Sequence, residues 1–236
     1  MINLYKDLYK VRSKRVEDKM AEETSGKDKK EENSKKLLPD FKVFDIYDIS
    51  EIQVNDPGLK EVINLEPRLV VKTHGRNNTE RFGRSKINVV ERLGNKIATA
   101  GHRGKKHKIE KGEITSKTTK VNKIILEAFK IIEKQTKKNP VEVLVRAIEN
   151  SAPRDEVTVI EYGGARYPQA VDSSPIRRVN LALRNLSHGA SDRAFSKKTS
   201  FSDGVKEEIV AAAKGSSDSF AVSKKNEAEK QADSAR

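Results

Sequence analysis

The chain has 236 residues, of which 35% are hydrophobic and 35% are charged, and its formal net charge is +13. The absence of cysteine excludes disulfide bonds, cysteine-ligated zinc and thiol catalysis, and neither a signal peptide nor a run of about 18 apolar residues that could cross a membrane is present. We therefore expect a soluble cytoplasmic protein with a core of roughly 120–150 residues and a polyanionic partner, which could be nucleic acid, an anionic membrane or an acidic protein.

The positive charge is concentrated in two stretches. Residues 68–120 carry 15 basic and 4 acidic side chains, and residues 166–198 carry 7 and 2. A surface that serves solubility alone mixes its signs. The separation of charge therefore indicates a phosphate-binding face, and a solvated charged surface is the plainer alternative.

The first 84 residues are predicted to hold a tail and an extension. Residues 1–38 contain mixed-charge, low-complexity sequence that has little to bury, and we expect a disordered or extended charged tail. Residues 39–84 are expected to be an N-terminal extension with a turn at Pro57-Gly58. It ends in a basic stretch, His74 to Arg84, which has no apolar period, and we expect an extended arm lying on phosphates there.

Residues 85–236 are predicted to form a helical domain. Asn139 and Pro140 form a good helix start, with Glu142 at the capping-box position, and Ser174-Pro175 begins another helix. A helix that ends at Gly215 and a weaker one over residues 219–234 follow. Apolar residues repeat at helical spacing in these groups: Ile87, Val90, Leu93 and Ile97; Val121, Ile124, Ile125, Ala128, Ile131 and Ile132; Val141, Leu144, Val145 and Ile148; Ile176, Val179, Leu183 and Leu186; Val205, Ile209 and Ala213.

Two groups of basic residues lie between or on these helices. A second basic loop, residues 102–108, follows the first helix of the domain. On the helix that begins at Pro175, three arginines lie off the apolar stripe: Arg177, Arg178 and Arg184. We expect their guanidinium groups to face outward.

A β-hairpin is predicted near residues 156–171. β-Prone residues from Val157 to Ile160 precede the turn signal Gly163-Gly164, and a second short β-prone run follows. Two strands alone cannot enclose a core. We therefore expect a mainly α protein, with a helical bundle body, a protruding β-hairpin arm and an extended N-terminal tail.

The sequence lacks the patterns of catalysis. It has no P-loop, no dinucleotide-binding glycine motif and no HExxH zinc motif. His74, His102 and His107 lie in basic loops that would repel a metal ion. His188 lies near Ser187 and Asp192, but within about one helical turn, whereas a catalytic triad is assembled from separate elements. We expect neither an enzyme nor a metal or cofactor site.

Several stretches resemble the universal small-subunit ribosomal protein seven family, in its archaeal and eukaryotic branch. The run from Asn139 to Arg154 is similar to the core helix of that family, and the hairpin and the helix start at Ser174 follow it in the family's order. The resemblance covers about residues 41–236 and includes these further motifs: Asp56-Pro57-Gly58-Leu59-Lys60, Ile63-Asn64-Leu65, Arg81-Phe82-Gly83-Arg84, and Ser219-Phe220-Ala221-Val222-Ser223-Lys224-Lys225 to Arg236. Residues 1–38 have no counterpart, and the stretch Ile109–Thr118 is longer than the family's usual linker.

The resemblance implies a structural protein of the cytoplasmic ribosome that binds the 3′ major domain of the small-subunit rRNA and organises head assembly. It implies that neighbouring ribosomal proteins are partners, and that the hairpin arm (Tyr162, Gly163, Gly164, Arg166 and Tyr167) lies near mRNA and exit-site tRNA. No membrane partner is implied. The expected rRNA contacts are Arg76, Arg81, Arg84, Arg103, Lys105, Lys106, Lys108, Arg154, Arg177, Arg178 and Arg184.

Two other functions remain open on the residues alone. A non-specific architectural protein that compacts nucleic acid would show the same charge, but its binding would follow charge and salt only. An enzyme acting on nucleic acid would need a carboxylate cluster for metal ions, which the sequence does not show.

Overall fold

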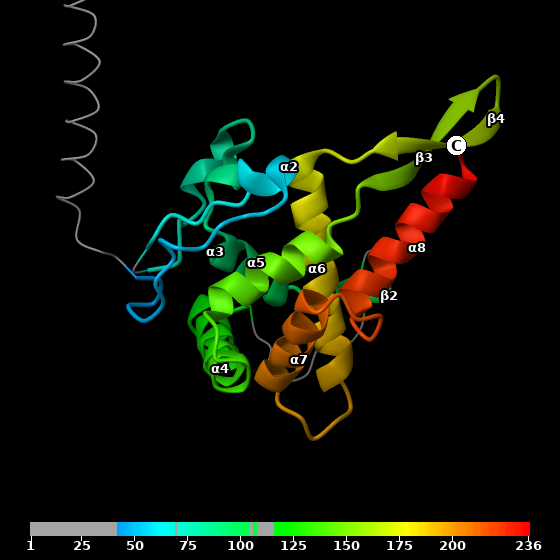
Figure 1. The fold of residues 1–236 in the computed structure, drawn as a ribbon. Helices are drawn as coiled ribbons and strands as arrows, with labels where there is room; N and C mark the ends of the chain where they lie inside the picture. Colours follow the sequence, from blue (N-terminus) through cyan, green and yellow to red (C-terminus); the bar gives the residue numbers. More distant parts are fainter. Residues whose placement is uncertain (1–41, 69, 104–105, 108–115) are drawn as a thin grey trace, which may run out of the picture. The chain divides into compact units, whose positions relative to one another are not determined.

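The structure, a computed structural model, describes residues 42–236 except 69, 104–105 and 108–115 (Figure 1). The predicted tail, residues 1–38, and most of the stretch Ile109–Thr118 lie outside the described residues. The helices are α2 (Pro57–Lys60), α3 (Val89–Ile97), α4 (Thr118–Thr136), α5 (Pro140–Ser151), α6 (Pro175–Ala194), α7 (Phe201–Ala213) and α8 (Phe220–Ser234). The described residues also form two 3-10 helices, η1 (Arg76–Thr79) and η2 (Gly83–Lys86). There are two antiparallel strand pairs: β1 (His102–Arg103) with β2 (Lys106–His107), and β3 (Asp155–Tyr162) with β4 (Ala165–Asp172).

The mainly helical fold with one long hairpin confirms the fold class predicted from the sequence. Two of the expected caps also form, at the start of α5 and at the end of α7. The Asn139 side chain accepts a hydrogen bond of 3.0 Å from Val141 N, with Pro140 at the first position of α5. Gly215, just beyond α7, adopts a left-handed φ of 69°, which glycine adopts without a steric penalty.

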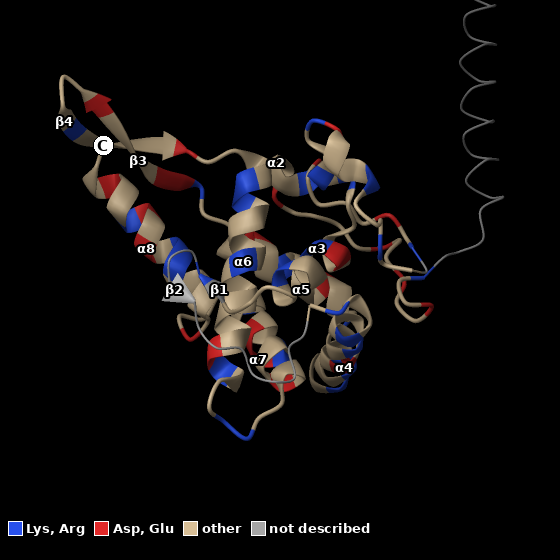
Figure 2. Ribbon diagram, turned by 180° about the vertical axis from the view of Figure 1, so that it is seen from behind, with Lys and Arg blue, Asp and Glu red and all other residues tan. Residues whose placement is uncertain are grey.

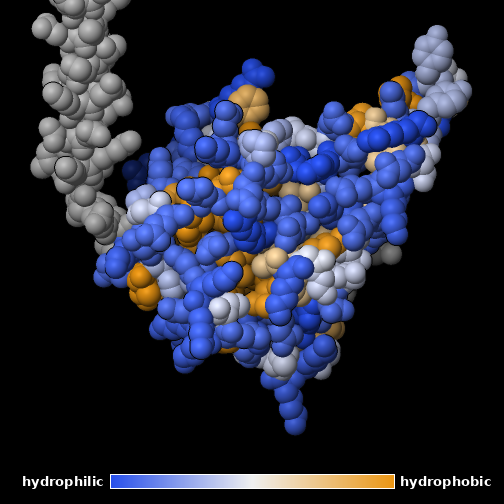
Figure 3. Space-filling view, viewed as in Figure 1, coloured by the Kyte–Doolittle hydropathy of each residue, from blue (hydrophilic) through white to orange (hydrophobic). Residues whose placement is uncertain are grey.

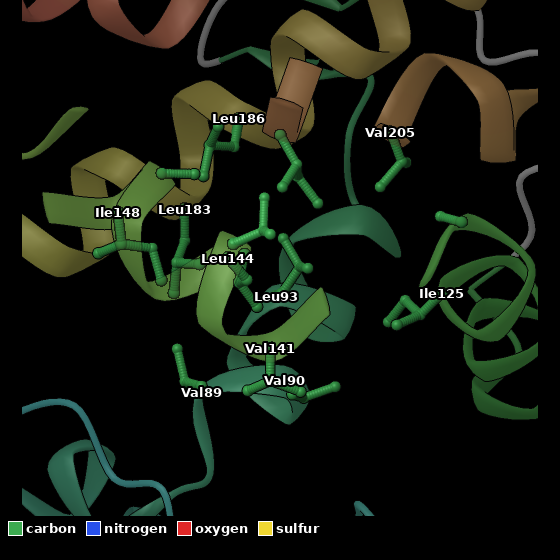
Figure 4. Packing of buried hydrophobic residues seen from close by; sticks show 14 of the residues in the cluster. Val89, Val90, Leu93, Ile125, Val141, Leu144, Ile148, Leu183, Leu186 and Val205 are labelled. Atoms are coloured by element: carbon green, nitrogen blue, oxygen red, sulfur yellow. The ribbon is translucent and has the colours of Figure 1, made fainter. Parts of the chain in front are cut away.

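One hydrophobic core joins the helices. Figure 4 shows labelled side chains of α3, α4, α5, α6 and α7 gathered in it, with Leu144 and Leu183 fully buried. Full burial of an aliphatic side chain of this size stabilises the fold by about 1.5–3 kcal/mol. Residues before α3 belong to the same core, among them Val43, Tyr47 and Leu59.

A buried carboxylate connects α6, α7 and the start of α8. Glu208 is fully buried, and it accepts hydrogen bonds from Arg193 Nε (2.9 Å), Ser219 Oγ (2.7 Å) and Ala221 N (3.0 Å). Gly189 makes room for it, since a Cβ at that position would lie 2.5 Å from the Glu208 carboxyl carbon. These partners compensate the cost of placing a charge in the core.

The long hairpin extends away from the helices, as predicted (Figure 1). Val157 pairs with Ala170 and Tyr162 with Ala165, so the loop between the strands is the two residues Gly163 and Gly164. Both have positive φ, 59° and 81°, which is the pattern of a type I′ turn. Most side chains of both strands are exposed, and the hairpin therefore adds little to the core.

The hairpin is held at its base by α6 and α8. Glu156 of β3 accepts hydrogen bonds from Ser173 Oγ (2.7 Å) and Arg177 Nη2 (2.7 Å). In α8, the Glu229 carboxylate accepts a hydrogen bond of 3.1 Å from Arg154 N, immediately before β3. In Figure 1, α8 runs along this part of the hairpin.

Three local predictions were wrong. The stretch from His74 to Arg84 is not an extended arm but folds into η1 and the start of η2, because Gly83 packs against the backbone of Asn77, where a Cβ would lie 1.8 Å from the carbonyl oxygen. The turn expected at Pro57 begins α2 instead, with Asp56 as its cap. The second basic loop contains β1 and β2.

Candidate nucleic-acid interface

A cationic pocket lies between η2, α3 and the first half of α6. It comprises two adjoining cavities, of about 700 and 230 Å³, that share Arg84, Lys96 and Asn180. Arg184 of α6 lines the larger cavity and Arg92 of α3 the smaller. In Figure 2, Lys and Arg segments recur along α6. We call the surface formed by these five residues the cationic pocket.

The position of α3 places two of these cations together. Asn88 caps the helix by accepting a hydrogen bond of 2.9 Å from Val90 N, and it also donates one of 2.8 Å to Glu66 O. Because Arg92 and Lys96 are four residues apart, they lie on the same face of α3. Arg92 is 5% exposed and donates hydrogen bonds to Val62 O (2.9 Å) and Asn180 Oδ1 (3.3 Å).

The surroundings of the pocket disfavour the charged forms of two of its basic side chains. Burial, followed by the charges of Arg184, Arg84 and Arg92, lowers the pKa of Lys96. Burial and the nearby Arg84 lower the pKa of Arg92 to about 10. Within the part of the chain that the structure describes, no carboxylate forms an ion pair with Arg84, Arg92, Lys96 or Arg184, whereas Arg177, which also lines the larger cavity, pairs with Glu156. An anion in the pocket would relieve this repulsion.

An exposed aromatic ring borders the pocket. Phe82 lines the larger cavity and is 62% exposed, with a left-handed φ of 60°. The Arg81 guanidinium carbon lies 5.1 Å from the centre of its ring, within the range of a cation–π contact. An exposed ring next to cations can stack a base while the cations bind phosphates.

Some of the predicted rRNA contacts are free to reach a partner. Arg76, Arg81, Arg84, Arg154 and Arg184 are all exposed. Of these, Arg84 and Arg184 are brought together in the cationic pocket, whereas Arg76 lies on η1 and Arg154 just before β3.

Other predicted contacts are engaged within the protein. Arg178 forms an ion pair of 2.8 Å with Asp56, and its side chain is only 11% exposed, so the prediction that its guanidinium faces outward was wrong. Arg103 pairs with Asp192 at 3.0 Å and donates a hydrogen bond to His188 O. The partner of Arg177, at the base of the hairpin, is Glu156.

The remaining predicted residues fall in two places. Lys105 and Lys108 lie outside the described residues, and Lys106 belongs to β2. The hairpin residues Tyr162, Gly163, Gly164, Arg166 and Tyr167 are exposed around the turn, with Tyr162 81% exposed. Figure 3 shows that hydrophilic residues cover most of the visible face, with some hydrophobic ones on the hairpin.

Three residues of the interface were missed by the sequence reasoning. Arg92 and Lys96 lie in a helix for which the sequence analysis considered only the apolar stripe. Their spacing of four residues, off that stripe, could have indicated that they share one face of the helix. Asn180 gave no signal, because its role depends on the packing of α3 against α6.

The geometry defines a class of protein. In the described ranges, no group of His, Asp and Glu could hold a metal ion, and none of the helices there is long and apolar enough to span a bilayer. A helical body that presents a cationic pocket, an exposed aromatic ring and a long exposed hairpin is typical of a protein that binds a folded polyanion.

Comparison with known proteins gives the family. The family model for ribosomal protein S7p/S5e matches residues 60–236. The chain is 49% identical to the small ribosomal subunit protein uS7 of Nanoarchaeum equitans over 83% of its length and 99% of that protein's. For the protein of the same name from Archaeoglobus fulgidus, the identity is 47%, over 82% of the chain and 94% of the relative. The chain belongs to the ribosomal protein S7p/S5e family, whose members are structural and not enzymes.

Proposed function

We propose that the protein is a structural constituent of the small ribosomal subunit, at work in the cytoplasm, and that the cationic pocket binds the backbone of folded rRNA. The observation that carries the proposal is the gathering of Arg84, Arg92, Lys96 and Arg184 around the pocket, where burial and, after it, the charges of the other three cations lower the pKa of Lys96. A phosphate group in the pocket would restore the balance of charge, and Asn180 could add a hydrogen bond to the sugar-phosphate backbone.

The finer role follows the family. The chain would bind the 3′ major domain of the rRNA and organise assembly of the head of the subunit, and the hairpin arm would lie near exit-site tRNA and mRNA. Two features support this placement of the arm. Its strands contribute little to the core, and its end exposes Tyr162 and Tyr167, which can stack on unpaired bases.

The proposed contacts are divided by what the side chains already do. Arg76, Arg81 and Arg154 would add phosphate contacts around the pocket and the hairpin base, and Arg177, whose side chain is 59% exposed, would add one beside its pair with Glu156. The basic residues of the loop at 102–108 would extend the interface. Arg103 and Arg178 are mainly internal ion-pair partners, so their contribution to RNA binding would be small beside their structural role.

The first test is a titration of the full chain at fixed, near-physiological salt against a folded fragment of the 3′ major domain. An unfolded RNA of equal charge and duplex DNA serve as competitors. We expect the folded fragment to bind tighter by orders of magnitude, because it presents phosphates from several directions. Equal binding of all three, fading with salt alone, would replace the proposal with an architectural, nucleic-acid-compacting function.

The pocket itself is tested with a double variant, Arg84→Ala with Arg184→Ala. Each exposed arginine that contacts a phosphate is expected to contribute about one unit to the salt slope of the affinity, so the slope should fall by about two. The control removes two exposed lysines of α4, Lys130→Ala with Lys134→Ala, since α4 contributes no residue to the pocket. An equal loss in both double variants would show that the pocket is not a specific contact.

A further inference from the structure

A further cavity lies between α3, the start of α4 and the segment before η1, and it adjoins the cationic pocket, with whose smaller cavity it shares Asn78, Ile87 and Asn95. Its volume is about 370 Å³, near the lower end of the range of roughly 300–1,000 Å³ for ligand pockets. Val71, Ile87 and Val121 give it apolar walls, and Asn95 and Asn122 add amide groups. Glu91 of α3 also lines it.

Glu91 has one oxygen that is used and one that is not. Its Oε1 accepts hydrogen bonds from Thr73 N (2.8 Å) and Thr73 Oγ1 (2.9 Å). Its Oε2 is buried and has no hydrogen-bond partner among the described residues, and the residue as a whole is 9% exposed. A buried carboxylate oxygen without a donor is costly, so a ligand that brings an N–H group into this cavity would favour a small turn of the Glu91 side chain that presents Oε2 to it.

The charge around the cavity selects the kind of ligand. Among its described lining residues, Glu91 is the one carboxylate and Lys72 the one permanent cation. The stretch 68–120 is strongly basic, with 15 basic and 4 acidic side chains. A lysine or arginine of another protein would be repelled by this surface. A nucleotide suits both signs, because its base brings N–H donors and its phosphate is attracted by the cations.

We propose that this cavity binds an unpaired adenine or cytosine of the RNA, whose exocyclic amino group donates a hydrogen bond to Glu91 Oε2. Because one carboxylate oxygen is available, a base whose one donor group on the Watson–Crick edge is its amino group fits better than guanine, which adds the neighbouring N1–H donor. Proteins commonly recognise RNA through such bases, splayed out of the helix and bound by their edges. The inference rests on the proposed RNA-binding function and adds base recognition to the phosphate contacts.

The test is dimethyl sulfate probing of the folded 3′ major domain fragment bound to the full chain, combined with the binding titration. The reagent modifies the Watson–Crick edges of unpaired adenine and cytosine, so a base in the cavity is protected. We expect at least one such base to be protected by the wild-type protein and to become reactive with Glu91→Gln. The variant keeps an oxygen for Thr73 but presents an amide N–H₂ group where Oε2 was.

The change in affinity for the RNA is a second readout, because its direction differs between the proposal and the alternative. Glu91→Gln should weaken binding by about tenfold to a hundredfold, the value of a hydrogen bond to a charged group. Removal of a negative charge without any base contact would instead tighten binding to RNA. The matched control is Glu61→Gln, because Glu61 is exposed and does not line the cavity; it should leave the protected base unchanged.

A second variant makes the test independent of the stability of Glu91→Gln. Ala98→Leu fills the cavity from the end of α3, where the backbone is helical, and it should expose the same base to the reagent. Unchanged protection and affinity in both variants would overturn the proposal. A wild-type chain that does not prefer the folded fragment would instead contradict the proposed function.

Discussion

Arg178 and Arg184 lie on the same helix, yet the structure gives them different surroundings. Arg178 is paired with Asp56 at 2.8 Å and donates a hydrogen bond of 3.2 Å to Pro153 O. Burial acts to raise the pKa of Asp56, but the hydrogen bond from Arg178 keeps this pKa below its ordinary value. Arg184 is exposed and faces the cationic pocket. The first arginine therefore stabilises the fold, whereas the second is available to a ligand.

This difference gives a prediction. Arg178→Ala should lower the free energy of unfolding by about 3 kcal/mol, because it leaves Asp56 partly buried without its partner. Arg184→Ala should change it by less than about 0.5 kcal/mol, as is usual for exposed positions, while weakening rRNA binding. Urea denaturation and the RNA titration, applied to both variants, separate the two roles. Comparable stability losses in both would contradict the assignment.

The sequence alone could not separate these two arginines. Both lie off the apolar stripe of α6, so periodicity predicts an outward direction for each. The partner of Arg178 is 122 residues earlier in the chain, and only the packing of α2 against α6 brings it near. Arg84 and Arg184 were each predicted as RNA contacts and are exposed, whereas the buried Arg92 is placed by a helix contact that spacing does not reveal.

At the scale of elements, the hairpin depends on the ion pair at its base. The hydrogen bond from Arg177, opposed by burial and assisted by Ser173, lowers the pKa of Glu156 below its ordinary value of 4.5. The contribution of this pair is therefore complete above pH 4.5 and is lost as the pH falls through the lower, folded-state pKa. Since the Arg177 side chain is 59% exposed, solvent screening keeps the contribution to about 1 kcal/mol or less.

We expect the base of the hairpin to loosen in acid. Glu156→Gln should shift the amide resonances of Val157 and Ser173 at neutral pH, and the wild-type resonances should approach those of the variant below pH 4.5. Glu161→Gln is the control, because Glu161 pairs with Arg166 near the exposed turn, at 3.6 Å. Amide resonances at the base that do not respond to Glu156→Gln would show that the ion pair does not hold the hairpin.

The elements differ in how well the sequence predicts them. The faces of α4, α5, α6 and α7 follow from apolar spacing, and the type I′ turn follows from Gly163-Gly164, because both signals are local. The folding of η1 and η2 was missed, since it depends on the close approach of Gly83 to Asn77. A glycine within a basic stretch can indicate either a flexible backbone or close packing against another segment, and the sequence alone does not distinguish the two.

At the scale of the whole molecule, the described residues from 42 to 236 form one compact unit with a shared core. Leu144 is fully buried in it. Leu144→Ala should lower the free energy of unfolding by about 2–5 kcal/mol through the lost contacts and the resulting cavity. The urea midpoint should fall with an unchanged slope, in a single transition.

The control for this prediction is Val159→Ala on the hairpin. Val159 is 59% exposed, so its truncation should hardly move the midpoint. Equal effects of the two substitutions would contradict the conclusion that the hairpin lies outside the core. A change in the slope for Leu144→Ala would show that the unit does not unfold as one.

The contacts between the base of the hairpin and α8 also affect the order in which parts of the protein fold during synthesis. β3 and β4 leave the translating ribosome long before Glu229 and Arg236, which contact Arg154 and Asp155 at the hairpin base. The cationic pocket, by contrast, needs no residue after Arg184 among those that line it. All residues that line the cationic pocket are thus synthesised while the arm still lacks its contacts with α8, and these contacts form only after α8 is released.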